Sequence, residues 1–340
     1  MPMSNLFQKA VMWTDIHVGL KSNSITHLED CMAYVQWMVN TAKANGCETC
    51  FFLGDFHNNR ASINILSLNY SIKILELISK SFEQVFFIPG NHDQFYRDKR
   101  DVQSVEWAKH LPNITIVNDF FQRDNVSIVP WLVGDEHKRI QKINAEYMLG
   151  HFELPHFFMN SLVRMPDHGD LRSEHLGHIG SVFSGHFHKR QTSDNITYIG
   201  NCFPHNYADA SDDARGCMIL EWGGTPEYHT WPDQPTYRVY NLSDVLTNTT
   251  ALLKAGMHVR VNLDIDISYE EANYIREQFS GTYGLRDITL MAAKTTALSE
   301  IEAKGSITFD SVDTIVSQQL SSIEVGNFDP KLLLEIYRNL

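Results

Sequence analysis

Five short apolar runs, each followed at once by glycine, aspartate, asparagine or histidine, constrain the fold of this chain more than any other feature. The runs cover residues 10–13, 49–53, 85–88, 147–149 and 182–183. Short runs rich in valine, isoleucine and phenylalanine between polar turns predict buried strands. Helical patterns occupy 26–42, with a capping-box sequence at Thr26 and Glu29, and about 63–79. Strands and helices at this spacing predict βαβ units and a layered α/β domain.

The polar motif after each run supplies side chains that bind metals. In chain order the motifs are Asp15-x-His17, Gly54-Asp55, Gly90-Asn91-His92-Asp93, Gly150-His151 and Gly185-His186-x-His188. Each motif alone is weak, because a Gly-Asp or Gly-His pair after a strand is more often a turn. Together they bring Asp, Asn and His to the carboxyl ends of five strands, where α/β sheets place their sites.

The charge balance of the chain favours bound cations at the carboxyl ends of these strands. The chain has 28 basic and 41 acidic residues, a net charge of −13, and 16 histidines among 340 residues. Such a chain is no basic wrapper of nucleic acid, so a phosphate-bearing substrate needs local positive charge such as bound cations. Two adjacent cations need a bridging carboxylate and several terminal ligands. Mixed oxygen and imidazole donors exclude a pure calcium site and suit manganese, iron, zinc or nickel.

Composition excludes several classes of protein. With 43% hydrophobic and 20% charged residues, the chain is neither disordered nor collagen-like. Five cysteines in a long chain argue against a disulfide framework, and a structural interpretation of them is preferred. The sequence contains no apolar run of membrane-spanning length and no basic-then-apolar N-terminal signal, so we expect a cytoplasmic protein that makes no membrane contact.

The last third of the chain has a different texture. Strands are predicted at 196–200, 217–222 and 228–230, and a domain edge at 231–240, where two prolines occur. Residues 258–291 predict a small β-α-β unit. The final forty residues contain two amphipathic helical stretches, which are too short to bury their apolar faces alone. They dock either on the chain's own domains or on a partner.

The five motifs, in this order and spacing, resemble those of the calcineurin-like metallophosphoesterase superfamily over residues 11–200. The segments 128–131, 150–154, 184–188 and 198–200 resemble SbcD-type nucleases, in a compact form similar to the bacteriophage versions. The resemblance implies an α/β fold: a layered metallophosphoesterase β-sandwich flanked by helices, a small α+β capping domain and a C-terminal helical segment. The implied bounds are 1–235 for the nuclease domain, 245–298 for the capping domain and 299–340 for a segment that docks on an SbcC-type ATPase.

By position, the resemblance implies roles for nine residues. Asp15, His17 and His188 would hold the first metal, and Asp55 would bridge. Asn91, His151 and His186 would hold the second. His92 would face the scissile phosphate, and Asp93 would either orient His92 or cap the loop. The implied cofactors are two divalent ions, manganese first, with magnesium, iron or zinc as alternatives.

One departure concerns the histidine that cellular members carry three residues after the bridging aspartate. Asn58 stands there, and His57 comes one residue earlier. His57 is either a residue of the cleft or a solvated loop histidine. Basic residues beside the motifs either touch a DNA backbone or are solvated surface charges; they are Arg97, Lys99, Arg100, Lys138, Arg139, Lys189 and Arg190. Trp131, in a predicted strand, is expected in the core.

The function that follows is a two-metal DNA nuclease that hydrolyses phosphodiesters with a metal-bridging hydroxide. It would be the nuclease subunit of an SbcC–SbcD-like, ATP-dependent complex that processes DNA ends in recombination, repair or replication, and a homodimer. The alternative is another metallophosphoesterase, such as a phosphoprotein phosphatase or a small phosphodiester hydrolase. A non-catalytic scaffold is a third hypothesis, although no ligand position is missing.

Overall fold

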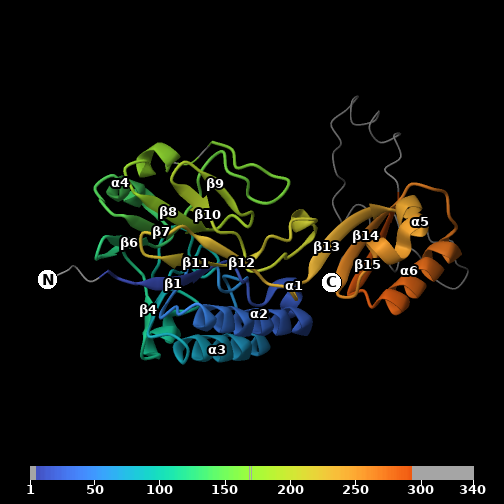
Figure 1. The fold of residues 1–340 in the computed structure, drawn as a ribbon, viewed down its shortest axis with the longest axis horizontal. Helices are drawn as coiled ribbons and strands as arrows, with labels where there is room; N and C mark the ends of the chain where they lie inside the picture. The colour runs from blue at the N-terminus through green and yellow to red at the C-terminus, as the bar shows by residue number, and fades with distance from the viewer. Residues whose placement is uncertain (1–4, 168, 170, 293–340) are drawn as a thin grey trace, which may run out of the picture. The chain divides into compact units, whose positions relative to one another are not determined.

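Two six-stranded sheets pack face to face in the computed structural model, which describes residues 5–167, 169 and 171–292 (Figure 1). The first has the order β12-β11-β1-β2-β3-β4 and the second β5-β6-β7-β8-β10-β9. The strands of the first sheet are β1 (Lys9–Trp13), β2 (Thr49–Phe52), β3 (Gln84–Phe87), β4 (Ile114–Ile116), β11 (Gly216–Glu221) and β12 (Glu227–Thr230). Those of the second are β5 (Phe121–Arg123), β6 (Val126–Val129), β7 (Tyr147–His151), β8 (Ser181–Gly185), β9 (Gln191–Ser193) and β10 (Ile196–Tyr198).

Strand alternation divides the apolar side chains between two cores. Met12, Phe51 and Phe86 point between the sheets and meet Leu149 of β7 and Phe183 of β8. Their chain neighbours point to the opposite face of the first sheet, as the two-residue period of a strand requires. The five predicted strands therefore belong to two sheets. β1, β2 and β3 run parallel in the first, and β7 and β8 run parallel in the second.

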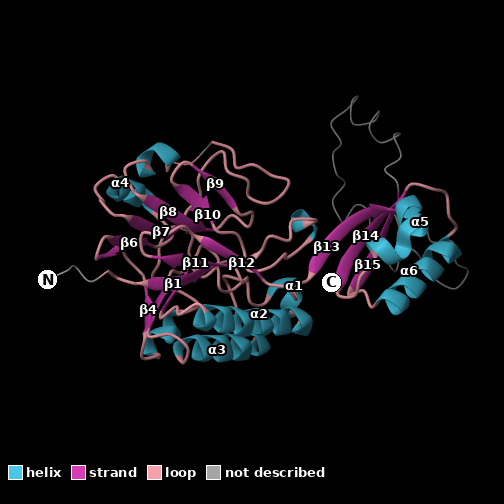
Figure 2. Cartoon of the chain, viewed as in Figure 1, coloured by secondary structure: helices cyan, strands magenta, loops and turns pink. Residues whose placement is uncertain are grey.

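Helices α2 (Ile25–Ala44) and α3 (Ile65–Ser79) cover the outer face of the first sheet (Figures 1 and 2). Leu28, Val35 and Leu75 are buried against the strands. The capping-box prediction is wrong: Ser24 precedes the first turn of α2, so Thr26 lies inside the helix. The short α1 (Leu20–Asn23) contains left-handed residues and joins β1 to α2.

Loops and short helices cover the outer face of the second sheet. The helical pieces are α4 (His137–Ile140) and the 3₁₀ turns η2 (Gly134–Glu136) and η3 (Ser173–Leu176). Two further 3₁₀ turns are η1 (Glu106–His110), before β4, and η4 (Tyr207–Asp209), before β11. The layered prediction, an α/β fold with a β-sandwich flanked by helices, is confirmed. No helix in the described ranges is long and apolar enough to cross a membrane.

Residues 236–292 form a separate three-stranded sheet with its own apolar cluster. Its order is β13 (Thr236–Asn241), β14 (Met257–Leu263), β15 (Asp287–Ala292), with helices α5 (Leu242–Leu252) and α6 (Tyr269–Tyr283). The predicted β-α-β unit is present as β14, α6 and β15. The prediction was incomplete, because it did not include β13 and α5. β13 falls in the stretch interpreted as a domain edge, and it pairs in parallel with β14. The predicted segment 299–340 lies outside the described residues.

Candidate metal centre

The carboxyl ends of β1, β2, β3, β7 and β8 meet at one rim of the sandwich. The backbone N–H of Asp15, after β1, donates to the carbonyl of Gly54, after β2, at 2.9 Å. Across the sheets, the N–H of His186 donates to Asp15 Oδ2 at 3.0 Å. His151 Nδ1 lies 2.6 Å from the carbonyl oxygen of Leu53. These bonds bring motifs from distant parts of the sequence into one cluster.

Two glycines explain why the motifs have their form. A Cβ atom on Gly54 would lie 2.2 Å from Nδ1 of His151, and one on Gly90 would lie 2.2 Å from Oδ1 of Asp55. No side chain fits at either distance. Gly54 also has a φ of 108°, which L side chains rarely adopt. The glycines let the backbone approach the imidazole and the carboxylate.

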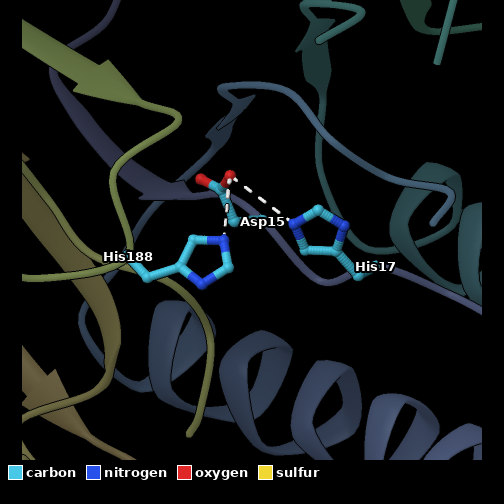
Figure 3. Close-up of side chains that lie close together, drawn as sticks. All are labelled: Asp15, His17 and His188. Atoms are coloured by element: carbon cyan, nitrogen blue, oxygen red, sulfur yellow. Dashed lines mark ion pairs between the residues drawn. The ribbon is translucent and has the colours of Figure 1, made fainter. Parts of the chain in front are cut away.

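A first group of donor atoms consists of Asp15, His17 and His188 (Figure 3). Both imidazoles turn a ring nitrogen toward the same carboxylate oxygen. The Nε2 atoms of His17 and His188 each lie 3.9 Å from Asp15 Oδ1. That separation is too long for a hydrogen bond and suits two atoms that contact one cation, each at about 2.0–2.2 Å.

The same group has buried polar atoms without partners. Asp15 Oδ1 and both ring nitrogens of His17 are buried and form no hydrogen bond. Buried polar groups are normally paired, so each such atom needs an explanation. A cation would satisfy Asp15 Oδ1 and a nitrogen of His17 together, and the donor set therefore fits a metal.

A second group consists of Asp55, Asn91, His151 and His186. Asn91 Oδ1 lies 3.1 Å from both His151 Nε2 and His186 Nδ1, and His151 Nε2 lies 3.4 Å from Asp55 Oδ2. The opposite nitrogen of His151 faces a carbonyl oxygen and therefore carries a proton, so Nε2 is the nitrogen that faces the group. Asp55 also lies 3.9 Å from His17 Nε2, so it is shared with the first group.

The electrostatics favour an ionised Asp55. Burial opposes its charge, but the charge and hydrogen bond of His151 hold the pKa of Asp55 well below its ordinary value. Burial likewise opposes a charge on His151, but Asp55 outweighs it and raises the pKa of His151 to about 9, so the ring carries a proton on both nitrogens at neutral pH and a cation would displace the one on Nε2. Burial lowers the pKa of His17 well below its ordinary value, so its imidazole is neutral. A carboxylate and neutral imidazoles are the forms that bind metals.

His92 stands over the centre. Its backbone N–H donates to Asp55 Oδ1 at 2.9 Å, and its Nδ1 lies 2.8 Å from the carbonyl oxygen of Asn58. Nδ1 therefore carries a proton, and Nε2 is the nitrogen left for a substrate. The ring lines a cavity of about 320 Å³ together with His17, Asp55 and His188.

Comparison with known families agrees with this geometry. The model of the calcineurin-like phosphoesterases matches residues 11–190, more than half of the chain. The chain belongs to the calcineurin-like phosphoesterase family. All seven residues of the two donor groups lie inside the matched range, and the resemblance to this superfamily is confirmed. Members of the family bind divalent metals.

The individual relatives share little sequence identity with this chain. The chain is 25% identical over 216 residues to exonuclease subunit 1 of Enterobacteria phage T4. The alignment covers 61% of this chain and 62% of that relative, so more than a third of the relative has no counterpart in the match. Among solved structures, the nuclease MPE of Pseudomonas putida is 18% identical, with a TM-score of 0.28, over 53% of this chain and 61% of that one.

Asp93 contacts the backbone of the two loops that follow β2 and β3. Its carboxylate accepts the backbone N–H groups of Phe56 at 3.0 Å, His57 at 2.8 Å and Gly90 at 3.0 Å. Burial, and next the charge of Asp55, raise the pKa of Asp93 to about 6. These bonds tie the loop after β2 to the loop after β3.

Both hypotheses for His57 are wrong. The ring is buried, with Nδ1 2.8 Å from the hydroxyl of Ser104 and Nε2 2.9 Å from that of Ser71. It neither reaches the cleft nor meets solvent. The prediction that Trp131 is a core residue of a strand is also wrong, because β6 ends at Val129 and the indole is only half-buried.

Three residues that contact the donor groups were missed by the sequence analysis. Glu153 Oε2 lies 3.1 Å from His186 Nε2, and the Thr14 hydroxyl donates to Asp15 Oδ2 at 2.6 Å. His205 Nε2 lies 2.9 Å from the carbonyl oxygen of Asp15. Glu153 and Thr14 adjoin recognised motifs, which was a usable signal. His205 adjoins none of the five.

Most of the basic loop residues are engaged within the protein. Carboxylates pair with Lys99, Arg100, Lys138 and Arg139. Lys189 lies over the ring of Phe158, and Arg190 over that of Tyr228. Among the described ion pairs, Arg97 takes part in none.

Proposed function

We propose that this protein is a two-metal-dependent DNA nuclease that hydrolyses phosphodiester bonds. The observation that carries the proposal is the position of Asp55, which lies in one donor group with His151 and His186 and also lies 3.9 Å from His17, a member of the other group. Family membership supports phosphoester hydrolysis, and the phage exonuclease subunit supports DNA as the substrate.

Each cation would have its own terminal ligands. Asp15, His17 and His188 would hold the first, Asn91, His151 and His186 the second, and Asp55 would bridge. When bound, two such cations supply an activated water nucleophile and offset the charge of the phosphate. Manganese is the first candidate, with magnesium, iron or zinc as alternatives.

The chain's own residues would do the rest. The Nδ1–H of His92 donates to the Asn58 carbonyl, so the ring is held with Nε2 toward the cavity, where it would contact the scissile phosphate or protonate the leaving oxygen. Asp93 would hold both loops, and with them Asp55 and His92, in place. Glu153 and Thr14 would orient His186 and Asp15.

The test is digestion of end-labelled linear double-stranded DNA in Mn²⁺, with and without chelator. Wild type should cut only when metal is present, and Asp55→Asn should abolish cutting. Asp135→Asn, an exposed aspartate in an ion pair with Lys138, is the matched control and should cut as wild type does. Unchanged cutting by Asp55→Asn would overturn the proposal.

A phosphomonoester and a chromogenic phosphodiester separate the proposal from the alternative of another phosphoesterase. Rapid hydrolysis of either small substrate without any cleavage of DNA would favour a phosphatase or a small phosphodiester hydrolase. Cleavage of DNA supports the nuclease.

We further propose that the protein is the nuclease subunit of an SbcC–SbcD-like, ATP-dependent complex acting in DNA repair, recombination or replication in the cytoplasm. The name of the phage relative, a subunit, supports an assembly. The proposed domains are 1–235, 245–298 as the capping domain, and 299–340 as the segment that docks on the ATPase. A chain that ends at residue 308 should lose the ATPase and keep basal nuclease activity.

A homodimer is part of the same proposal. Helix α3 leaves Ile65 85% exposed, Leu66 39% and Ile72 37%, and these are apolar side chains that a second copy of the chain would cover. In sedimentation, we expect wild type to be a dimer and the Ile65→Asp protein to be a monomer. Dimers that persist in this variant would place the interface elsewhere.

A further inference from the structure

A pocket of about 210 Å³ borders the second donor group, apart from the cavity under His92. Its wall includes the ligand Asn91 and also Glu153, whose carboxylate contacts His186. The remaining wall residues are Arg60, Gln94, Tyr96, Arg97 and Trp131. The pocket thus places cationic and aromatic side chains next to the position proposed for a metal.

The two arginines are notable for lacking carboxylate partners. Among the residues that the structure describes, no ion pair or hydrogen bond involves the guanidinium of Arg60 or Arg97. The nearby Arg100 is neutralised by Glu136, with both contacts at 2.6 Å. The pocket wall holds one carboxylate, Glu153, which contacts His186, against two arginines without an ion pair, and this surplus of positive charge in a chain of net charge −13 indicates an anionic ligand.

Gln94 provides a second, independent indication. Its side chain is 1% exposed, and its amide nitrogen has no hydrogen-bond partner. A buried amide donor without an acceptor carries a desolvation cost that a native protein normally avoids. A ligand that brings an oxygen acceptor into the pocket, such as a phosphate or the carbonyl of a base, would satisfy it.

Trp131 provides an aromatic surface that is held in place. Its ring packs 5.1 Å from that of His186 and 5.8 Å from that of His151. Its carbonyl oxygen accepts from Arg100 Nη1 at 2.7 Å, and Arg100 is itself fixed by Glu136. Tyr96, 37% exposed, adds a second ring. Aromatic rings beside a basic groove are the usual means of binding unpaired nucleotides.

We propose that this pocket binds the nucleotide next to the scissile phosphate, with its base unpaired. Arg60 and Arg97 receive the neighbouring phosphate, Gln94 donates to an oxygen of the nucleotide, and Trp131 and Tyr96 stack on the base. The inference rests on the proposed nuclease function and sharpens its substrate class. A base inside a duplex has both faces covered by its neighbours, so the substrate is a single-stranded or frayed end.

The experiment is steady-state cleavage of a labelled single-stranded oligothymidine in Mn²⁺. Trp131→Ala should raise KM about tenfold or more, with little change in kcat or metal content, and Trp131→Phe should restore most of the loss. Arg97→Gln should raise KM and reduce its dependence on salt. Arg123→Gln, an exposed arginine paired with Asp124 outside the pocket, is the control and should cleave as wild type does.

An abasic scan of the oligonucleotide tests the stacking without relying on a variant that folds. In wild type, removal of one particular base should raise KM as Trp131→Ala does. The Trp131→Ala protein should no longer respond at that position. Equal KM values for all abasic positions would overturn the inference, as would a Trp131→Ala protein with wild-type KM.

Failure of this inference is distinguishable from failure of the proposed function. Wild-type protein that cleaves DNA while the pocket variants and abasic substrates behave normally overturns the pocket alone. Wild-type protein that hydrolyses a chromogenic phosphodiester and cuts no DNA overturns both.

Discussion

The two halves of the metal centre differ in how the protein satisfies their donor atoms. In the first half, Asp15 Oδ1 and both nitrogens of His17 are buried without hydrogen-bond partners. In the second half, every ring nitrogen of His151 and His186 lies within 3.1 Å of an oxygen atom: Asn91 Oδ1 lies near both rings, and Leu53 and Glu153 lie near the other nitrogens. The first half therefore depends on a cation to satisfy its buried atoms, whereas the second is held in shape by the protein itself.

Asp55→Asn should have the largest effect, because Asp55 belongs to both halves. Loss of the shared carboxylate should weaken both ions and reduce DNA cleavage by roughly 10³-fold or more, since each cation supplies several kcal/mol of transition-state stabilisation. Metal analysis and cleavage rates on the same sample test this. Loss of only one ion would mean that the halves do not share this carboxylate.

His92→Ala should have the next largest effect, and it should leave metal binding in both halves unchanged. A general acid or electrostatic contact to the substrate is worth about 10²–10⁴-fold in rate. We expect that loss in kcat with unchanged metal content. His110→Ala, which alters an exposed histidine at the end of η1, is the control. Loss of metal from His92→Ala would make it a ligand instead.

Thr14→Val and Glu153→Ala should separate the halves. Thr14 donates to Asp15 in the first half, and Glu153 contacts His186 in the second. Removal of such an outer contact lowers metal affinity about 10–100-fold. Metal titration should show one weakened ion in each variant, and the double variant should show two. A single variant that lowers the affinity for both ions equally would show that the two halves do not have separate outer contacts.

His57→Ala should have the smallest effect on catalysis. The change leaves the hydroxyls of Ser71 and Ser104 without this partner, at a cost of about 1–3 kcal/mol in the free energy of unfolding. Thermal unfolding should shift down while metal content and kcat stay near wild type. A large loss of kcat in a folded His57→Ala protein would return this residue to the active site.

The sequence predicted the strands that carry the donors, because each apolar run ends in a distinctive polar motif. It could not predict which nitrogen of His151 faces Asn91, because that follows from the carbonyl of Leu53 across the centre. His205 was missed for a similar reason: its contact with Asp15 is formed 190 positions apart along the chain, with no motif around it.

Outside the centre, the sequence was less informative where structure depends on pairing. β13 was interpreted as part of a domain edge because two prolines precede it, and only its pairing with β14 makes it a strand. The His57 hypotheses failed because the two serines that bury its ring come from a helix and a loop that local sequence does not bring together.

The most direct test of two cations sharing Asp55 is the number of metal ions bound per chain, measured for wild type, His188→Ala and His151→Ala after equilibration with Mn²⁺. We predict two ions in wild type, one in each variant and none when both changes are combined. A single ion in wild type, or one ion left in the double variant, would contradict a two-metal centre.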